Sequence, residues 1–392
     1  MSLIFTRSRR DLGDTPDQLV PPRSRSVGNT IISAETALKA SAMWACLRLR
    51  ADLISTMQIN VVRQVGDIVV SAPSTPFLID PAGDGFGTAD WLYSSQMDLD
   101  RIGNVFGLIT ARDGMGLPAR VELQRRQDVT VLGRGPSITG YRIAGTEYQP
   151  KDVWHERQFT IPGVPLGLSL IAYAAQSIGQ YLSAQEFGNQ WFANGRIPAA
   201  ELTNKAKTID PKEAKIAKDR FKASIENRDL FVHGSDWEYN MIAVNDGESQ
   251  FISTQSFGVT DMARFCGVPG DLIDAASESS AKITYANITQ RNLQLLVMNL
   301  LPTLVRRERA ISAAFPKPRY VEFDPDSSLL RMDPQTRATV QAALITARLR
   351  VPSELRDGDN LAPYTDDQYA EFDRLFGKTG QAAQPPRQGV PS

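Results

Sequence analysis

The sequence predicts an α+β protein, because strand patterns fill much of its first half and helical periodicity dominates its second half. Between residues 104 and 162, short runs rich in Val, Ile and aromatic residues alternate with Gly and Pro, which is typical of strands joined by tight turns. From Pro165 onward, apolar residues recur every three to four positions, which indicates amphipathic helices. A chain of 392 residues is long for one hydrophobic core, so we expect two or more packed lobes.

Local signals place the elements of the first half. The polar segment 1–32 has no apolar period and is expected to be a disordered arm, so order begins near Ser33, a plausible N-cap. A helix over 34–56 follows, and the Val- and Ile-rich runs around Gly66-Asp67 predict a hairpin. Another helix is expected near 88–102, just before the run of strands.

In the second half, two helices bracket a compact insert. The first runs from Leu168 to a helix stop at Asn194-Gly195, and the second spans 248–265. Inside the insert, a capping box begins at Asp210, with Pro at the first helical position, and is the clearest local signal in the chain. The segments DLFVH and WEYNMIAV, on either side of residues 234–236, predict a hairpin.

A polar loop of small residues follows the second helix, and a long loop inside a folded chain is usually functional or disordered. It leads into a helix over 284–313 that is apolar on most faces and therefore needs cover on several sides. Pro302 is expected to kink this helix. The chain is completed by the strand RYVEF, helices over 334–349 and 365–376, and a disordered tail over 377–392.

The composition is that of an ordinary soluble globular protein and restricts its partners. The 43 basic side chains are balanced by 44 acidic ones, for a net charge of -1. Proteins that hold DNA tightly usually carry a basic excess, so any nucleic acid is not held here by bulk charge. Cys46 and Cys266 lie in apolar helical patterns, which favours the reducing cytosol over a disulfide framework. Neither a signal peptide nor a membrane span is indicated, so we expect no membrane partner.

Signals for catalysis are poor. The two histidines, His155 and His233, have no Gly-x-Ser-x-Gly nucleophile elbow to serve, and are interpreted as a structural residue in an apolar strand and a turn residue. No Cys/His spacing suits zinc, and Asp98 and Asp100 diverge on a helix. The segment 377–379 lacks the earlier glycine of a phosphate-binding loop. We therefore expect no enzyme, no cofactor and no metal site.

Two basic clusters, Arg125-Arg126 and Arg306-Arg307-Arg309, have two interpretations. A solvated or salt-bridged face is the first, and contact with DNA is the alternative. Lys282 is the lone cation of the Ser/Ala-rich segment 275–285.

Six short motifs follow one another between residues 33 and 363, and although each is weak alone, their common order is specific. They are Ser41-x-x-Trp44-x-Cys46 with Ala51 and Ile54, Gly103-Asn104-Val105-Phe106, Pro165-x-Gly167-x-Ser169-x-Ile171, Phe192-Ala193-Asn194-Gly195-x-x-Pro198, Ala263-Arg264-x-x-Gly267-Val268-Pro269, and Leu301-Pro302 through Arg309. In these motifs the chain resembles the siphovirus-type portal proteins of tailed double-stranded DNA bacteriophages. It departs from them at Met262, usually Ile, and at Cys266, usually aromatic.

The resemblance implies a portal fold made of named regions. These are a wing over 33–165, a first stem helix over 166–194, a clip over 195–246, a returning stem helix over 247–267, a tunnel loop over 268–285, a long tunnel helix and returning wing strand over 286–332, and a crown over 333–376. The pair of amphipathic helices around a small insert is compatible with antiparallel rods that carry a distal tip.

For function, the resemblance implies a dodecameric ring at one vertex of the virion capsid, assembled in the bacterial cytoplasm, through which double-stranded DNA is packaged and ejected. Its other implied partners are the terminase motor, which hydrolyses ATP, the major capsid or scaffold protein, and the head-completion adaptors. The implied tunnel-loop residues are Ser277, Ser279, Ser280, Lys282 and Thr284. The implied docking residues of the clip are Lys212, Lys215, Arg228, Asp229, His233 and Asp236.

Three other classes stay open at this point. Another phage head–tail connector would form rings, but connectors are generally shorter and do not need the helix–insert–helix–loop–helix order of 166–313. An ordinary intracellular binding scaffold is the second class. The third is a hydrolase based on His155 or His233, for which no set of nucleophile, base and orienting group can be assembled.

Overall fold

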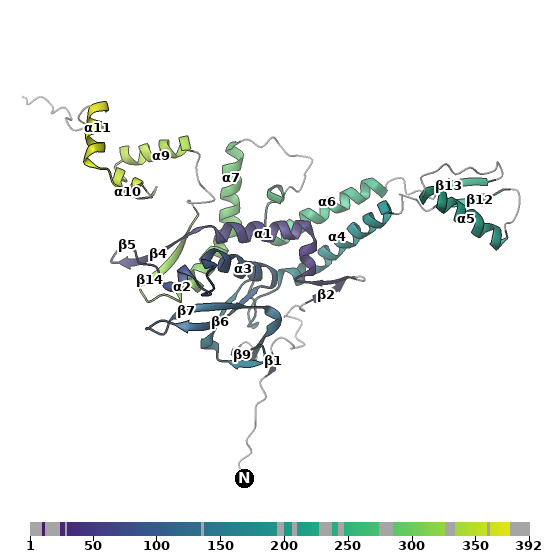
Figure 1. Cartoon of the computed structure of the whole chain (residues 1–392), viewed down its shortest axis with the longest axis horizontal. Coiled ribbons are helices and arrows are strands. Elements are labelled where there is room, and N and C mark those ends of the chain that lie inside the picture. The colour runs from purple at the N-terminus through teal and green to yellow at the C-terminus, as the bar shows by residue number, and fades with distance from the viewer. Residues whose placement is uncertain are drawn as a thin grey trace, which may run out of the picture. The chain divides into compact units, whose positions relative to one another are not determined.

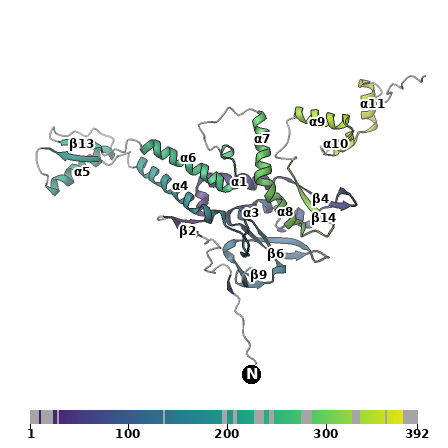
Figure 2. The same cartoon turned by 180° about the vertical axis from the view of Figure 1, so that it is seen from behind.

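The computed structural model describes most of the chain, in two compact units that run from Met1 to Leu330 and from Arg331 to Ser392. The described residues are 10–11, 24–27, 30–134, 137–193, 200–205, 210–226, 237–241, 247–273, 285–325, 334–358 and 361–376. Both units contain helices, and every described strand lies in the first (Figures 1 and 2).

The first unit is ordered earlier than the sequence predicts. Strands β2 (Ser24–Val27) and β3 (Thr30–Ser33) form an antiparallel hairpin inside the segment expected to be disordered, and both strands contact helix α4. Ile32 of this hairpin is buried, so the segment makes an apolar contact that its polar composition did not predict. The Oγ of Ser33 accepts a hydrogen bond from the backbone N–H of Thr36 at 3.2 Å, but the N-cap position of the turn that follows is Glu35, two residues later than predicted.

The predicted helix over 34–56 is divided in two. A 3₁₀ turn over Thr36–Lys39 is followed by the extended residue Ala40, and helix α1 spans Ser41–Ser55. The predicted helix near 88–102 is confirmed as α3 (Gly87–Ile102), which ends at Gly103 in the left-handed conformation.

Three antiparallel sheets hold most of the strands that the sequence predicts. In order across each sheet, they are β14 (Arg319–Asp324), β4 (Gln58–Val65) and β5 (Ile68–Ser71); β11 (Val153–Arg157), β6 (Asn104–Arg112) and β7 (Pro118–Gln124); and β1 (Arg10–Asp11), β8 (Val129–Arg134), β9 (Ser137–Ile143) and β10 (Thr146–Tyr148). The hairpin predicted around Gly66-Asp67 is β4–β5, where Gly66 has a φ of 62°.

Helix α1 joins two of the three buried apolar clusters. Through Leu47 it packs against α4 (Leu170–Ala193) and α6 (Gly247–Cys266). Through Ile54, at its other end, it packs into a second cluster with α3, the long helix and the sheet of β4. The third cluster lies around Phe106, between the sheets of β6 and β8. Helix α1 therefore connects the interior of the helical pair with that of the sheet of β4.

Helices α4 and α6 form an antiparallel pair (Figures 1 and 2). The Oγ of Ser177 hydrogen-bonds to Asp261 at 2.5 Å, and the ring of Tyr181 packs against the backbone of Gly258. Tyr181 follows Ser177 on α4, whereas Gly258 precedes Asp261 on α6, so the two helices run in opposite directions. The predicted second helix, 248–265, is confirmed as α6.

The insert contains a strand pairing that the sequence did not reveal. Helix α5 (Pro211–Glu226) begins at the predicted capping box, but strand β13 (Trp237–Met241) pairs with β12 (Ala200–Asn204). The segment DLFVH and the turn at 234–236, the other parts of the predicted hairpin, lie outside the described residues.

The long apolar helix is interrupted where Pro302 predicts a break. It consists of α7 (Tyr285–Leu295), a π-helical turn over Leu296–Leu300, and α8 (Leu301–Ser312). Pro302 lies in the first turn of α8, directly after the π turn, and it cannot donate a backbone hydrogen bond to that turn. The π turn just before it is a usual way for a helix to absorb such a discontinuity.

The second unit is helical in its described part. It contains α9 (Pro334–Thr346), α10 (Pro352–Gly358) and α11 (Asp366–Phe376), of which α10 was not predicted. The guanidinium of Arg356 lies 3.9 Å from the ring centroid of Tyr364 and ties α10 to the segment before α11. No helix among the described residues is long and apolar enough to cross a bilayer.

Candidate functional site

Two of the sequence motifs meet at a tight backbone contact, which we call the glycine joint (Gly103, Asn104 and Gly167). The side chain of Asn104 donates a hydrogen bond to the carbonyl of Gly167 at 2.8 Å and accepts one from its N–H at 2.8 Å. A Cβ on Gly167 would lie 2.0 Å from the carbonyl oxygen of Gly103. The two chain segments are therefore in contact at a distance that only glycine permits.

The glycine joint determines where α4 begins. The Oγ of Ser169 donates to the carbonyl of Arg101 at 3.0 Å, at the end of α3, and accepts from the N–H of Ala172 at 3.2 Å. The second of these bonds is a helix N-cap. The first helix of the pair is thus fixed next to the end of α3 by the side chain of its cap residue, Ser169, and by the glycine joint two residues before it.

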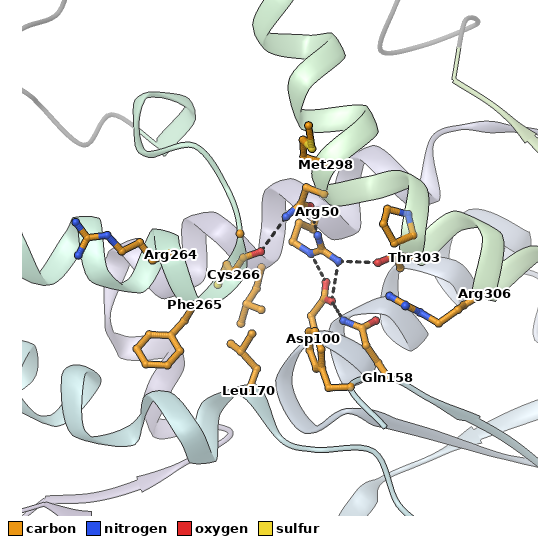
Figure 3. Close-up of a pocket in the computed structure, with 15 residues that line it drawn as sticks. Arg50, Asp100, Gln158, Leu170, Arg264, Phe265, Cys266, Met298, Thr303 and Arg306 are labelled. Carbon is orange, nitrogen blue, oxygen red and sulfur yellow. Dashed lines mark hydrogen bonds and ion pairs between the residues drawn. The ribbon is translucent and has the colours of Figure 1, made fainter. Parts of the chain in front are cut away.

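A buried charge pair forms a second joint, which we call the arginine joint (Arg50, Asp100, Gln158, Asn299 and Thr303; Figure 3). Arg50 and Asp100 are 5% and 2% exposed, and their two hydrogen bonds are 3.0 and 3.1 Å long. Gln158 donates to the same carboxylate at 3.0 Å. This bidentate geometry is the strong form of an arginine–carboxylate pair.

The arginine joint connects the long helix to the rest of the unit. Arg50 also donates to the Oγ1 of Thr303 at 3.1 Å and to the side-chain oxygen of Asn299. The amide of Asn299 in turn donates to the carbonyl of Cys266, the last residue of α6, at 3.0 Å. A Cβ on Gly267 would lie 2.7 Å from that amide nitrogen. Helices α1, α3, α6 and α8 therefore converge on one hydrogen-bond network.

A pocket of about 230 Å³ opens beside this network. Arg264 and Arg306 contribute positive charge to its lining, and Met298 and Phe265 contribute apolar surface. The one carboxylate of the lining, Asp100, is already engaged by Arg50 and Gln158. The arrangement is suited to holding helices in position, and it offers no free base beside a nucleophile.

His155, the histidine expected to be structural, packs among aromatic and polar side chains. Its ring stacks on Phe106 with centroids 4.4 Å apart. Its Nδ1 lies 2.9 Å from the hydroxyl of Tyr141, and its Nε2 lies 3.2 Å from the side-chain oxygen of Asn104. Since that amide oxygen can only accept, Nε2 carries the proton of the neutral ring. Burial, reinforced by the charges of Arg157 and Arg126, lowers the pKa of His155 to about 3.

This environment predicts a specific pH dependence. In the unfolded chain His155 binds a proton below about pH 6.5, whereas in the folded chain it stays neutral, so stability falls as the pH drops below that value. The loss attributable to this residue is at most about 1.4 kcal/mol per pH unit. We expect His155→Gln to lose less stability than the wild type between pH 7 and pH 5 in thermal unfolding. Equal losses in the two proteins would contradict the assignment.

Most of the site residues suggested by the resemblance are not described. Lys212 and Lys215 are exposed on α5. The remaining clip residues and the tunnel-loop residues fall outside the described residues: Arg228, Asp229, His233, Asp236, Ser277, Ser279, Ser280, Lys282 and Thr284. The described chain reaches the loop from both sides, through a 3₁₀ turn over Gly270–Ile273 and through the start of α7 at Tyr285.

The arginine joint was missed by sequence reasoning. Its one usable signal is that Arg50 lies four residues after Cys46, so it sits on the apolar face of a predicted helix, where a charge needs a partner. Asp98 and Asp100 do diverge as expected, since Asp98 pairs with Arg101. Among the described residues, no group of three or more His, Cys, Asp or Glu side chains is arranged to hold a metal ion.

Comparison with known proteins identifies a family and curated relatives of this chain. Residues 41–360 match the family described as "Phage portal protein". The chain is 26% identical over 377 residues to the probable portal protein of Streptomyces phage phiC31, covering 88% of this chain and 80% of that protein. It is 24% identical over 353 residues to the portal protein of Enterobacteria phage HK97, covering 86% and 82%.

Solved structures share the fold. A crystal structure of an HK97-family phage portal protein from Corynebacterium diphtheriae matches with a TM-score of 0.58 at 16% identity, over 78% of this chain and 100% of that one. A chain in the neck of an empty gene transfer agent particle matches with a TM-score of 0.60 at 17% identity, over 84% and 94%. With the family match over most of its length, this chain belongs to the phage portal protein family.

Proposed function

We propose that twelve copies of this portal protein form the ring at one vertex of a phage capsid, and that genomic DNA is packaged and ejected through the centre of the ring. The observation that carries the proposal is the family match over residues 41–360. The number of copies is supported by a structure of similar fold, with a TM-score of 0.58, taken from a particle neck that was computed with C12 symmetry. The role is structural, and ATP hydrolysis is assigned to the terminase motor.

The described elements support a division into portal regions. We assign α4 and α6 as the stem, because they are an antiparallel pair on either side of an insert. The insert with α5 is then the clip, where the exposed Lys212 and Lys215 are available to the terminase and later to head-completion adaptors. The sheets before α4 are assigned as the wing and the helices of the second unit as the crown.

One face of the long helix has the character of a contact between subunits. Leu293, Val297 and Leu301 follow one another at intervals of four residues and are 48%, 45% and 43% exposed, and Met298 beside them is 77% exposed. Such a continuous apolar patch marks an interaction surface more often than a solvent-exposed face. A head-to-tail contact with the next copy would cover it and would close into a ring.

The apolar face predicts the effect of a charge on assembly. We expect Met298→Asp to weaken ring formation strongly and to leave the fold of the single chain intact, because the side chain is already exposed. Native mass and circular dichroism would measure these two properties. Met115→Asp is the matched control, since Met115 is 65% exposed on the turn between β6 and β7. If both variants assemble equally well, the assigned face is wrong.

The direct test of the ring is electron microscopy of the purified protein together with its native mass. Twelve copies of 43.2 kDa give about 518 kDa, and top views should show a ring with a central hole. A compact dimer with a closed surface would contradict the proposal.

The tunnel loop is proposed to meet the DNA. Ser277 and Thr284 are assigned to the channel as well, and we place Ser279, Ser280 and Lys282 at its narrowest point. The support is the position of the loop between α6 and α7. A conduit should hold its cargo weakly, because each cation bound to phosphate opposes sliding. The near-neutral net charge of the chain suits that requirement.

We expect Lys282→Glu to slow DNA packaging or to impair retention of the packaged genome, with normal ring formation. Packaged DNA per particle would be measured by nuclease protection. Lys39→Glu, at an exposed position on the 3₁₀ turn before α1, is the control and should package normally. If Lys282→Glu particles package and retain full genomes, the assignment of Lys282 to the channel is wrong.

A further inference from the structure

A second pocket, of about 260 Å³, adjoins the first, and both are lined by Gln158, Thr303 and Arg306. We call it the α8 pocket. Its walls come from the end of β11 and from one face of α8, and Arg157, Arg306, Arg307 and Arg309 all contribute to its lining. Nothing in the portal function proposed above assigns a role to this concentration of guanidinium groups.

Arg307 is the most informative of the four, because it is buried and only partly satisfied. It is 1% exposed, and its Nη2 donates to the hydroxyl of Ser95 at 2.8 Å. Its Nε and Nη1 have no hydrogen-bond partner, although Nε lies 3.5 Å from a carboxylate oxygen of Glu156. Buried N–H groups of a charged side chain are costly to leave unpaired, so an acceptor in the pocket would stabilise them.

The positive charge of the α8 pocket is not balanced by its own acids. Glu156 is the single carboxylate of the lining, and its other oxygen accepts from the indole N–H of Trp154 at 2.8 Å. Arg157 donates to the carbonyl of Pro165, which carries no charge. Within the described part of the chain, Arg306 and Arg309 make no hydrogen bond or ion pair. Partial burial and the charge of Arg50 lower the pKa of Arg306, and the nearby Asp100 offsets only part of this effect.

From this arrangement we propose that the α8 pocket binds a phosphate group through Arg306, Arg307 and Arg309. Guanidinium groups match tetrahedral oxyanions because each presents a planar pair of donors to two oxygens. Three such groups around one cavity can donate to several oxygens at once. A phosphate group presents more oxygens to them than a single carboxylate does. The volume of the pocket accommodates a phosphate group with bridging water.

The pocket recognises the phosphate group and not an attached base. Its one aromatic ring, His155, is already stacked on Phe106 and has a polar partner at each nitrogen. No ring face in the lining is therefore available for stacking a nucleobase. The same chemistry could come from free inorganic phosphate or from the phosphodiester backbone of DNA.

The test is calorimetric titration of the assembled protein with inorganic phosphate, at an ionic strength held constant with chloride. We expect saturable binding that Arg306→Gln and Arg309→Gln each weaken about tenfold, the effect of losing one charge-assisted hydrogen bond. Both side chains are exposed, so neither variant should unfold. Arg63→Gln, at an exposed arginine on β4 outside the pocket, is the matched control and should bind as the wild type does.

A competition experiment distinguishes the two sources. If a short DNA duplex displaces the phosphate, and displaces it less well in Arg306→Gln, the natural ligand is the DNA backbone. If DNA does not compete, the ligand is free phosphate, and both outcomes support the pocket. The proposal is overturned if phosphate binds no better than chloride, or if Arg63→Gln weakens binding as much as the pocket variants. Native mass, recorded on each variant, reports ring formation separately.

Discussion

Gly167→Ala is expected to be among the most damaging single substitutions in this chain. The added Cβ would lie 2.0 Å from the carbonyl oxygen of Gly103 and 2.4 Å from that of Gln158. Both obstacles are backbone atoms, which cannot rotate away as a flexible side chain can. The contact also holds the reciprocal hydrogen bonds with Asn104, so separating the segments breaks them as well. We expect a loss of about 4 kcal/mol or more in the free energy of unfolding, or no soluble protein.

Gly114→Ala is the matched control for this substitution. Gly114 lies in the turn between β6 and β7, has no atom within 4 Å of an added Cβ, and is not among the glycines with positive φ. Its substitution should change the free energy of unfolding by less than about 1 kcal/mol. Soluble yield and the midpoint of thermal unfolding would be measured for both proteins. Similar midpoints for the two variants would show that the glycine joint is looser than described.

Local patterns predicted much of the fold because the signals for those elements lie within a few residues of one another. The capping box at Asp210 and the periodicity of 248–265 define α5 and α6 without knowledge of the rest of the chain. The pairing of β12 with β13 could not be found in that way, because α5 separates the two strands. Likewise, nothing local showed that the polar segment before Ser33 contains a hairpin against α4.

The same distinction applies to the candidate site. The motifs that contain Gly103 and Gly167 were each recognised, yet the contact between them appears only when the sheet and α4 are in place. For the arginine joint, Arg50 and Asp100 are 50 residues apart and Asn299 is 249 residues from Arg50. Hydrogen bonds of this kind depend on tertiary packing, and their partners carry no common spacing that a sequence pattern could expose.

Asp100→Asn is the second substitution with a large expected effect. It removes the carboxylate charge that compensates Arg50, while the guanidinium stays buried among α1, α3 and α8. Breaking one side of a buried pair typically costs about 3–5 kcal/mol, because the remaining charge is left without compensation. Asp52→Asn is the control, since Asp52 pairs with Arg48 on the surface at 3.9 Å, and such a pair contributes less than about 1 kcal/mol. Chemical unfolding of the two variants should differ accordingly, and equal stabilities would contradict a stabilising role for the pair.

A double variant separates the charge from the packing around it. If the loss in Asp100→Asn comes from the stranded charge of Arg50, then adding Arg50→Met should restore at least about 1 kcal/mol, the coupling expected of contacting residues. Recovery of stability would leave open a geometric role, because Arg50 also holds Thr303 and Asn299 at the start of α8. Native mass of the double variant then decides between the two roles. Normal rings would mean that packing alone positions the long helix, whereas stable chains that assemble poorly would mean that the network orients the helix for its neighbour.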